Sequence, residues 1–349
     1  GVNRLDYEFT HAGGIFPVAS AVVGESFPEE RRGSVLGLIG AVWGIAFIVG
    51  PLLGMIILSL ASWQWLFLIN IPFAAAIIGF GWKLLPTARH SGGKKLDVAG
   101  LILTALFLGS LTLGLSGIDT GKALQSLAGP RVLPFLLAAI LLAPILAIVE
   151  RKAEDPVVRP SLFRKGQLRL AYLLAVGAGF GEAILVFVPS LGLASLAALG
   201  ITTANSSLLV FPVVIAMALG SPMIGRMVDK VGPRPVLIGG AALMGIGMLA
   251  FGLFSSFLPV FIAAGAMVGL GLSGLLGSPV RYVTLRESGD AERSSAQGLV
   301  SLAGSLGQLV AAALTGAVGE SAIAAAGGAA DPSTRAAAYG RAFLVVATA

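Results

Sequence analysis

The sequence has no cysteine and only two histidines, His11 and His90, among its 349 residues. Without thiols the chain can form neither disulfides nor thiolate metal sites, and two histidines are too few for an imidazole-based site. It also lacks a phosphate-binding loop of the form G-x-x-x-x-G-K-[ST]. We therefore predict no cofactor and no metal, and we exclude ATP hydrolysis as an energy source.

Charge is scarce as well, because only 11% of the residues are charged and 56% are hydrophobic. Ordinary soluble domains have roughly 25% charged residues and 45–50% apolar ones. Six stretches contain no Asp, Glu, Lys or Arg: residues 33–82, 98–118, 132–149, 183–225, 235–280 and 294–319. Each is long enough to cross a bilayer once or twice, since a spanning helix needs about 20 apolar residues. The sequence therefore predicts a polytopic, all-α transmembrane bundle.

The apolar runs and the loop signals between them predict about nine full spans and two partial ones. The full spans are expected at residues 33–58, 64–84, 98–118, 131–149, 168–192, 203–225, 235–254, 258–280 and 294–319, and the partial ones at 12–26 and 337–349. The first residues, GVNRLDYEFTH, do not have the pattern of a signal peptide. The helices themselves are therefore expected to direct insertion.

The basic residues gather in alternate loops. If the spans alternate across the membrane, 18 of the 23 Lys and Arg residues fall in loops on one side, at residues 29–32, 83–97, 150–169, 226–234 and 281–293. The positive-inside rule places these loops in the cytoplasm. This distribution explains the net charge of +6, so we do not predict nucleic-acid binding.

One basic loop carries a spaced motif, SPMIGRMVDKVGPRPVLIGG, with Gly225, Asp229, Gly232 and Arg234 in the pattern G-x-x-x-D-x-x-G-x-R. Glycines permit close backbone approach and positive φ, and a carboxylate can cap a helix N-terminus or pair with an arginine across a domain boundary. The motif predicts a latch between two bundles. The alternative is that its charges act only as topology determinants.

A second motif lies on the predicted span 33–58. Gly37, Gly40 and Gly44 fall within about 60° of one another around a helix, which predicts a groove that a neighbouring helix can approach closely. Further along, Pro51 has no amide donor and should disrupt the hydrogen bond to the carbonyl of Phe47. Such a helix suits a gate or a seal against ion leak, although small residues in spans also serve packing alone.

These motifs resemble signatures of the Major Facilitator Superfamily. The loop motif resembles the signature found between the second and third helices of each bundle in that family. Gly44, Gly50, Pro51 and Gly54, in GAVWGIAFIVGPLLG, resemble the antiporter signature on the fifth helix of proton-driven exporters. The stretch WQWLFLINIPFA, residues 63–74, resembles the sixth helix of the 14-helix drug:proton antiporter branch.

The resemblance implies three parts: a remnant of the N-terminal bundle (residues 1–86), two linking helices with cytoplasmic loops (87–160) and the C-terminal bundle (161–349). It also implies three helices before residue 12 and a longer last span than the chain contains. The family's R-x-x-Q-G-x-G entry to its fourth helix is not matched. Its Arg, Gln and two Gly positions hold Leu5, Glu8, Phe9 and His11.

Glu182 is the one acidic residue deep within a predicted span, and an ionisable group at that depth is a functional candidate. We expect it to face a central cavity and to bind a proton or a cationic substrate. The alternative is a protonated carboxyl bonded to a neighbouring helix. Four residues interrupt otherwise aliphatic faces and are candidates for lining the cavity: Trp43, Phe47, Asn205 and Gln308.

The sequence therefore predicts a secondary transporter, not an enzyme, that sits in the bacterial inner (plasma) membrane and exports amphipathic small molecules in exchange for protons. Its expected partners are the lipid bilayer, protons and a small-molecule substrate. Two alternatives stay open: export of a metabolite such as a sugar or an amino acid, and a nonfunctional fragment or partner subunit of a transporter. A membrane-embedded enzyme is not supported, because no nucleophile with a nearby histidine and no pair of intramembrane carboxylates is present.

Overall fold

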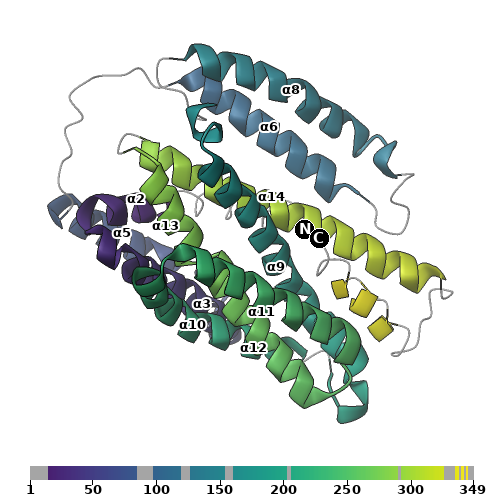
Figure 1. The fold of residues 1–349 in the computed structure, drawn as a ribbon. Coiled ribbons are helices and arrows are strands. Elements are labelled where there is room, and N and C mark those ends of the chain that lie inside the picture. Colours follow the sequence, from purple (N-terminus) through teal and green to yellow (C-terminus); the bar gives the residue numbers. More distant parts are fainter. Residues whose placement is uncertain are drawn as a thin grey trace.

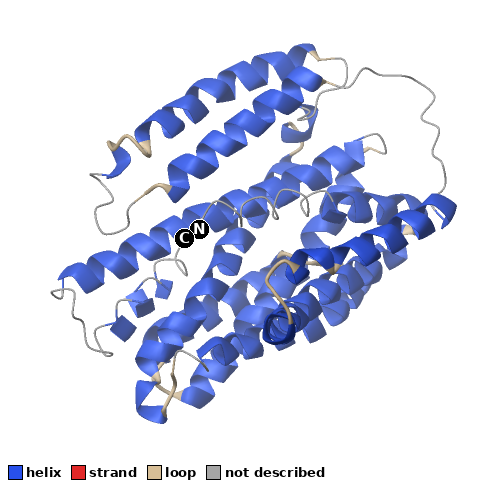
Figure 2. Cartoon of the chain, turned by 180° about the vertical axis from the view of Figure 1, so that it is seen from behind, coloured by secondary structure: helices blue, strands red, loops and turns tan. Residues whose placement is uncertain are grey.

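The computed structural model of the chain describes residues 15–84, 97–118, 126–153, 160–202, 206–289, 292–325, 335–337, 339–341 and 343–344. All regular structure in these residues is helical, and none of them lies in a strand (Figure 2). The predicted all-α membrane fold is therefore confirmed. The boundaries proposed at residues 86 and 160 stay a prediction.

The helices follow one another along the chain, as the colours in Figure 1 show. They are α2 (Ile15–Ser26), α3 (Glu29–Leu60), α4 (Trp65–Leu68), α5 (Asn70–Leu84), α6 (Val98–Ser116), α8 (Leu133–Lys152), α9 (Gly166–Ser195), α10 (Phe211–Val231), α11 (Pro233–Phe254), α12 (Leu258–Leu275), α13 (Ser278–Glu287) and α14 (Arg293–Ala325). Three short 3-10 helices, η3 (Pro160–Phe163), η4 (Ala197–Leu199) and η5 (Ser206–Val210), join them. Within the described ranges, eight helical segments are long and apolar enough to cross a membrane, and Trp65–Phe80 is a shorter apolar segment.

Local sequence signals explain where several helices begin and end. Proline stands in the first two positions of α8, α10, α11, α12 and α13, where its missing amide is not needed. Asp97 caps α6 by accepting a hydrogen bond from the amide of Gly100 at 2.8 Å. The last turn of α8 carries Arg151 and Lys152, whose charge complements the negative end of the helix.

Parts of several predicted loops are helical: residues 29–32 lie in α3, 166–169 in α9 and 226–231 in α10. The prediction for a further loop is wrong over most of its length. Residues 281–293 were expected to form a loop, but helix α13 continues to Glu287, and Arg281 and Tyr282 within it are buried. The polar residues of this segment made it resemble a loop in sequence. Arg281 and Tyr282 instead form hydrogen bonds with residues of α2, α3 and α14.

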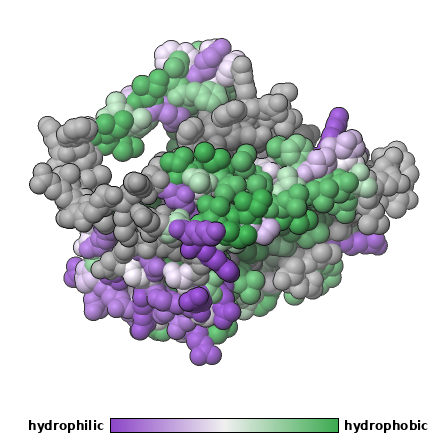
Figure 3. Space-filling model, turned by 90° about the horizontal axis from the view of Figure 1, so that it is seen from above, coloured by the Kyte–Doolittle hydropathy of each residue, from purple (hydrophilic) through white to green (hydrophobic). Residues whose placement is uncertain are grey.

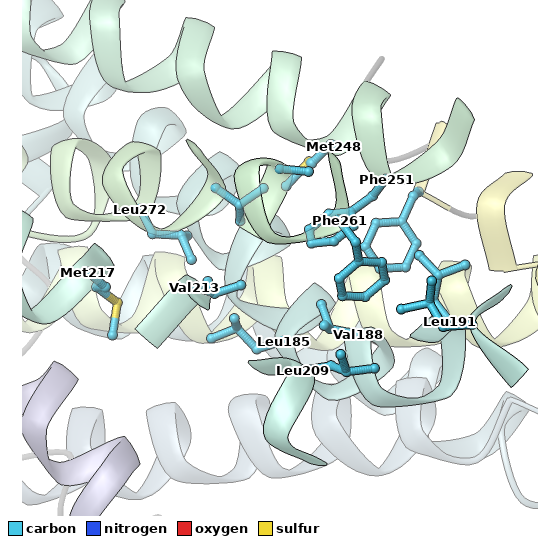
Figure 4. Close-up of a cluster of buried hydrophobic side chains, with 14 residues drawn as sticks. Leu185, Val188, Leu191, Leu209, Val213, Met217, Met248, Phe251, Phe261 and Leu272 are labelled. Carbon is cyan, nitrogen blue, oxygen red and sulfur yellow. The ribbon is translucent and has the colours of Figure 1, made fainter. Parts of the chain in front are cut away.

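The main core lies within helices α9 to α12, where leucine, valine, methionine and phenylalanine side chains meet (Figure 4). The ring of Phe251 packs edge to face on Phe261 at 4.8 Å between centroids, and on Phe343 at 5.4 Å. Phe343 is fully buried, which ties the C-terminal residues to this core.

Helices α6 and α8 form a hairpin that lies apart from the core helices and alongside α14 (Figure 1). Their apolar side chains are mostly exposed, as shown by Ile102 on α6 and Ile140 on α8. Hydrophobic surface covers the middle of the face seen in Figure 3, while hydrophilic residues gather toward one side of it. This distribution fits a protein whose sides contact lipid.

Candidate functional site

Small residues bring α3 and α10 into backbone contact. On α3, Gly37 and Gly44 leave no room for a side chain: a Cβ on Gly44 would lie 2.6 Å from the Cα of Ala218, and one on Gly37 would lie 2.6 Å from the carbonyl oxygen of Ser221. Gly40 faces the side chain of Ser221 in the same way. The groove predicted on α3 is therefore confirmed, and α10 is the helix that fills it. We call this contact the α3–α10 seam.

Asp229 closes one end of the seam. Its carboxylate accepts hydrogen bonds from the amides of Gly33 and Ser34, both at 2.8 Å, and from the hydroxyl of Ser34. These groups lie in the first turns of α3, where amide dipoles favour a negative charge. These contacts lie one turn inside α3, whose N-cap residue is Pro28, and we call this contact the Asp229 cap. Charge-assisted hydrogen bonds of this kind are about twice as strong as neutral ones.

The other members of the loop motif have different positions. Gly225 lies in the seam against the backbone of Gly33 and Gly37. Gly232 ends α10 and starts α11 with φ of +82°, a conformation that L side chains rarely adopt. Arg234 is exposed in the first turn of α11. The motif therefore combines a close approach, a cap and a turn.

A second set of contacts joins the same end of the molecule. Arg286 on α13 pairs with Glu29 on α3 at 3.4 Å, and the hydroxyl of Tyr282 donates to Glu29 at 3.4 Å. Beneath them, an apolar cluster joins α2, α3, α10, α11 and α13: Val23, Leu36, Val228, Val236, Tyr282 and Leu285. Helices α2 and α3 are therefore held to α10 and α13 by polar and apolar contacts together.

Four of the five basic loops predicted to share one side meet in this region. The Asp229 cap links residues 226–234 to residues 29–34, and the Glu29–Arg286 pair links the latter to α13. Residues 150–169 join through two contacts: Ser161 donates to Glu292 at 2.9 Å, and the amine of Lys165 donates to the carbonyl of Glu287 at 2.5 Å. The fifth loop, 83–97, lies almost wholly outside the described residues.

Glu182 is half-buried on α9 and interacts electrostatically with Arg281 on α13. Arg281 is only 9% exposed, and its guanidinium donates to the hydroxyl of Ser20 at 3.4 Å and to the side-chain oxygen of Gln297 at 3.3 Å. Gln297 returns a hydrogen bond to the carbonyl of Arg281 at 2.9 Å. These contacts form a buried polar network from α2, α9, α13 and α14.

Sequence reasoning missed Arg281 because it treated residues 281–293 as a loop. A signal was present: in SPVRYVTLRE, the proline at the second position starts a helix, and Arg281 follows a long apolar run. A buried arginine needs partners that compensate for its lost hydration. Glu182, Ser20 and Gln297 are those partners, and no short sequence window contains them all.

The antiporter signature divides between two environments. Gly44 lies in the seam, whereas a Cβ added at Gly50 or at Gly54 would have no atom within 4 Å and would meet open space. Pro51 lies within α3, which runs as one helix from Glu29 to Leu60. Of the three glycines in the signature, Gly44 therefore makes the close contact that a seal requires, and Gly50 and Gly54 do not.

Three of the four residues predicted to line a cavity are described by the structure, and they lie on two helices, α3 and α14. Trp43 and Phe47 lie one turn apart on α3 with ring centroids 5.7 Å apart, and they are 41% and 37% exposed. Gln308 is half-buried on α14, where its backbone nitrogen lies close to Gly179 of α9. Asn205 lies outside the described residues. Among the residues that the structure describes, no group of three His, Asp or Glu could hold a metal ion.

Comparison with known proteins finds a matching family model, similar sequences and a similar structure. The family model of the Major Facilitator Superfamily matches residues 9–193 and 170–330. The uncharacterized MFS-type transporter YfiU of Bacillus subtilis is 30% identical over 307 residues, which cover 86% of this chain and 58% of that protein. The multidrug transporter protein MdtP of the same organism is 28% identical over 309 residues, or 86% of this chain and 56% of that protein.

The crystal structure of the human organic anion transporter MFSD10 has a similar fold, with a TM-score of 0.60 at 16% identity over 95% of this chain and 67% of that one. The chain thus spans somewhat more than half the length of the curated relatives named above. Those relatives are bacterial and are named as transporters, and the eight apolar helices indicate a multi-pass integral protein of the plasma membrane. The chain belongs to the Major Facilitator Superfamily.

Proposed function

We propose that this chain is the larger part of a secondary transporter that exports an amphipathic small molecule in exchange for protons. The observation that carries the proposal is the Asp229 cap on α3, at the end of a seam built from glycines. This contact joins α3, on the N-terminal side of the predicted linking helices, to α10 on their C-terminal side. Transport by alternating access requires two bundles that can close at one end and open again.

The cap is suited to reversible closure. Asp229 is partly exposed and binds two amides and one hydroxyl at the surface of α3, so water can hydrate its carboxylate once the helices part. The salt bridge between Glu29 and Arg286 is also exposed, with side-chain accessibilities of 48% and 60%, so it adds little to stability. The positive-inside rule assigns the closed end to the cytoplasm.

Glu182 is the proposed coupling group. An ionisable residue inside a span is a candidate for carrying protons, and its electrostatic partner Arg281 also binds Ser20 on α2. A change of charge at Glu182 therefore alters the field on an arginine that holds α2 against α13. Protonation in the interior is thereby coupled to the contact between the two halves.

The proposed substrate class follows from exposed aromatic side chains on α3. Trp43 and Phe47 expose aromatic faces on α3 near the seam, and aromatic faces attract organic cations. MdtP, one of the similar proteins, is named as a multidrug transporter. We propose a lipophilic cation as the test substrate.

The proposal is tested by extrusion of a fluorescent lipophilic cation from energised vesicles, with and without a pH gradient. We expect gradient-dependent extrusion by the wild-type chain and its loss in Glu182→Gln. Glu25→Gln is the matched control, because Glu25 is exposed on α2 and belongs neither to the network nor to the seam. Gradient-dependent extrusion that persists in Glu182→Gln would contradict the assigned coupling role.

A further inference from the structure

A cavity of about 220 Å³ lies between the α6–α8 hairpin and helices α9 and α14. Its wall is almost entirely apolar and is formed mainly by Phe107, Leu108, Leu146, Leu299, Leu302 and Leu306. It contains neither Glu182 nor any residue of the α3–α10 seam, so it is separate from the proposed transport site. Figure 1 shows the hairpin lying alongside α14, the arrangement that creates this cavity.

Two hydroxyl groups interrupt the apolar wall. Tyr172 on α9 is 7% exposed, and its ring packs against that of Phe163 with centroids 5.5 Å apart. Its hydroxyl oxygen and that of Thr104 on α6 are both buried and have no hydrogen-bond partner among the described residues. Buried hydroxyls nearly always have a partner, so two such groups on the wall of one apolar cavity fit a ligand that supplies the acceptor.

The position of Tyr172 limits what that ligand is. Tyr172 lies six residues after the first residue of α9, or about 9 Å along the helix axis. Arg164 and Arg169, at the start of α9, are exposed. Cationic side chains at this level suit a phosphate headgroup, and a hydroxyl slightly deeper suits the ester carbonyl beneath it.

We propose that this cavity binds one ester-linked acyl chain of a membrane glycerophospholipid, with the hydroxyls of Thr104 and Tyr172 donating to its ester carbonyl. The apolar wall takes the hydrocarbon, and the exposed faces of α6 and α8 give access from the bilayer. The lipid chain fills the cavity between the α6–α8 hairpin and α14. It thereby adds contacts between the hairpin, which contains the predicted linking helices, and the C-terminal helices. This inference does not depend on the proposed export function.

The first test maps the site. The full chain is reconstituted in vesicles of phosphatidylethanolamine and phosphatidylglycerol that contain a phospholipid with a photoreactive acyl chain. After irradiation, peptides are analysed by mass spectrometry. We expect labelling at the cavity wall and a several-fold loss of that labelling in Ala303→Leu, which fills the cavity from α14. Ala312→Leu makes the same change at an exposed position of α14 and should keep the label.

The second test addresses the hydroxyls, without a change of volume. Wild type should retain an ester-linked phospholipid several-fold better than its ether-linked analogue, which lacks the carbonyl. Thr104→Val combined with Tyr172→Phe should abolish that preference. The control, Thr112→Val combined with Tyr339→Phe, makes the same changes outside the cavity wall and should retain it.

Three results would overturn the proposal: equal labelling in Ala303→Leu and Ala312→Leu, no ester preference in wild type, or displacement of the photoreactive lipid by a lipophilic cation. The last result would assign the cavity to a drug-like ligand instead. Gel filtration of every variant is the control for folding. A loss of label in a variant whose profile matches the wild type reports the site itself.

Discussion

The two halves of α3 have the same kind of sequence and opposite surroundings. In its first half, Gly37 and Gly44 touch the backbone of α10, and Asp229 caps its first turns. In its second half, Gly50 and Gly54 face open space, and most of the large apolar side chains are exposed. Glycine spacing therefore shows where helices can approach closely. Whether they do so depends on the partner helix.

The largest expected effect comes from the buried network at the closed end. Arg281→Met removes the cation that acts on Glu182 and leaves Gln297 without its donor. Arg281 donates two hydrogen bonds, to Ser20 and Gln297, and a hydrogen bond to a charged group is worth about 1.5–3 kcal/mol. We therefore expect a loss of about 3 kcal/mol in the free energy of unfolding, measured by denaturation in mild detergent. Adding Glu182→Gln should recover part of it. Additive losses in the double variant would show that the two side chains are not coupled.

A glycine pair tests the contrast within α3 directly. Gly44→Leu places a side chain where Ala218 already lies, so it should destabilise the protein by about 2 kcal/mol. Gly54→Leu makes the same change ten residues along the helix in open space and should be neutral or slightly stabilising, because leucine favours a helix over glycine. Melting temperatures of the two purified variants decide the matter. Equal losses would mean that the outer half has a partner after all.

The cap is expected to be worth somewhat less. Asp229→Asn replaces a carboxylate whose two oxygens accept three hydrogen bonds with a neutral amide that keeps one acceptor oxygen, and it should weaken closure by about 1 kcal/mol. The chain has no cysteine of its own, so spin labels can be attached selectively to the double variant Glu30→Cys and Lys230→Cys. Both positions are exposed, and the distance between the labels reports the separation of α3 and α10. Asp229→Asn should shift that separation to longer values. Asp97→Asn, which makes the same change at the cap of α6, should leave it unchanged.

The smallest effect should come from the exposed salt bridge at the same end. Arg286→Gln removes the pair with Glu29, and because both side chains are about half exposed, the cost should stay below about 0.5 kcal/mol. The same spin-label distance should remain within error of the wild type. An effect as large as that of Asp229→Asn would show that the pair, rather than the cap, holds the closed end.

Much of the fold could be predicted because membrane spans are continuous apolar runs. The predicted spans 98–118 and 235–254 correspond to α6 and α11 within about two residues. The segment 281–293 was not predicted correctly, because a buried polar helix and a loop have similar composition. Arg281 is stable in the interior only through partners on α2, α9 and α14, and these lie up to 261 residues away in sequence.

The candidate site was predictable where its residues lie close together in sequence. Asp229 and its glycines are contained in one short motif, so their capacity to form a latch could be inferred from spacing. Thr104 and Tyr172 carried no such signal, because a hydroxyl in a span is ordinary until its surroundings are known.

The sequence by itself determined that the chain crosses a membrane many times, that its basic loops alternate with its spans, and that thiol, metal and nucleotide chemistry have no residues to support them. These properties depend on composition and on local order along the chain. Only the tertiary structure decided that α3 closes on α10 at one end, that Arg281 meets Glu182, and that the hairpin leaves a cavity beside α14. Each of these depends on contacts between residues far apart in sequence, where the packing of whole helices determines which side chains meet.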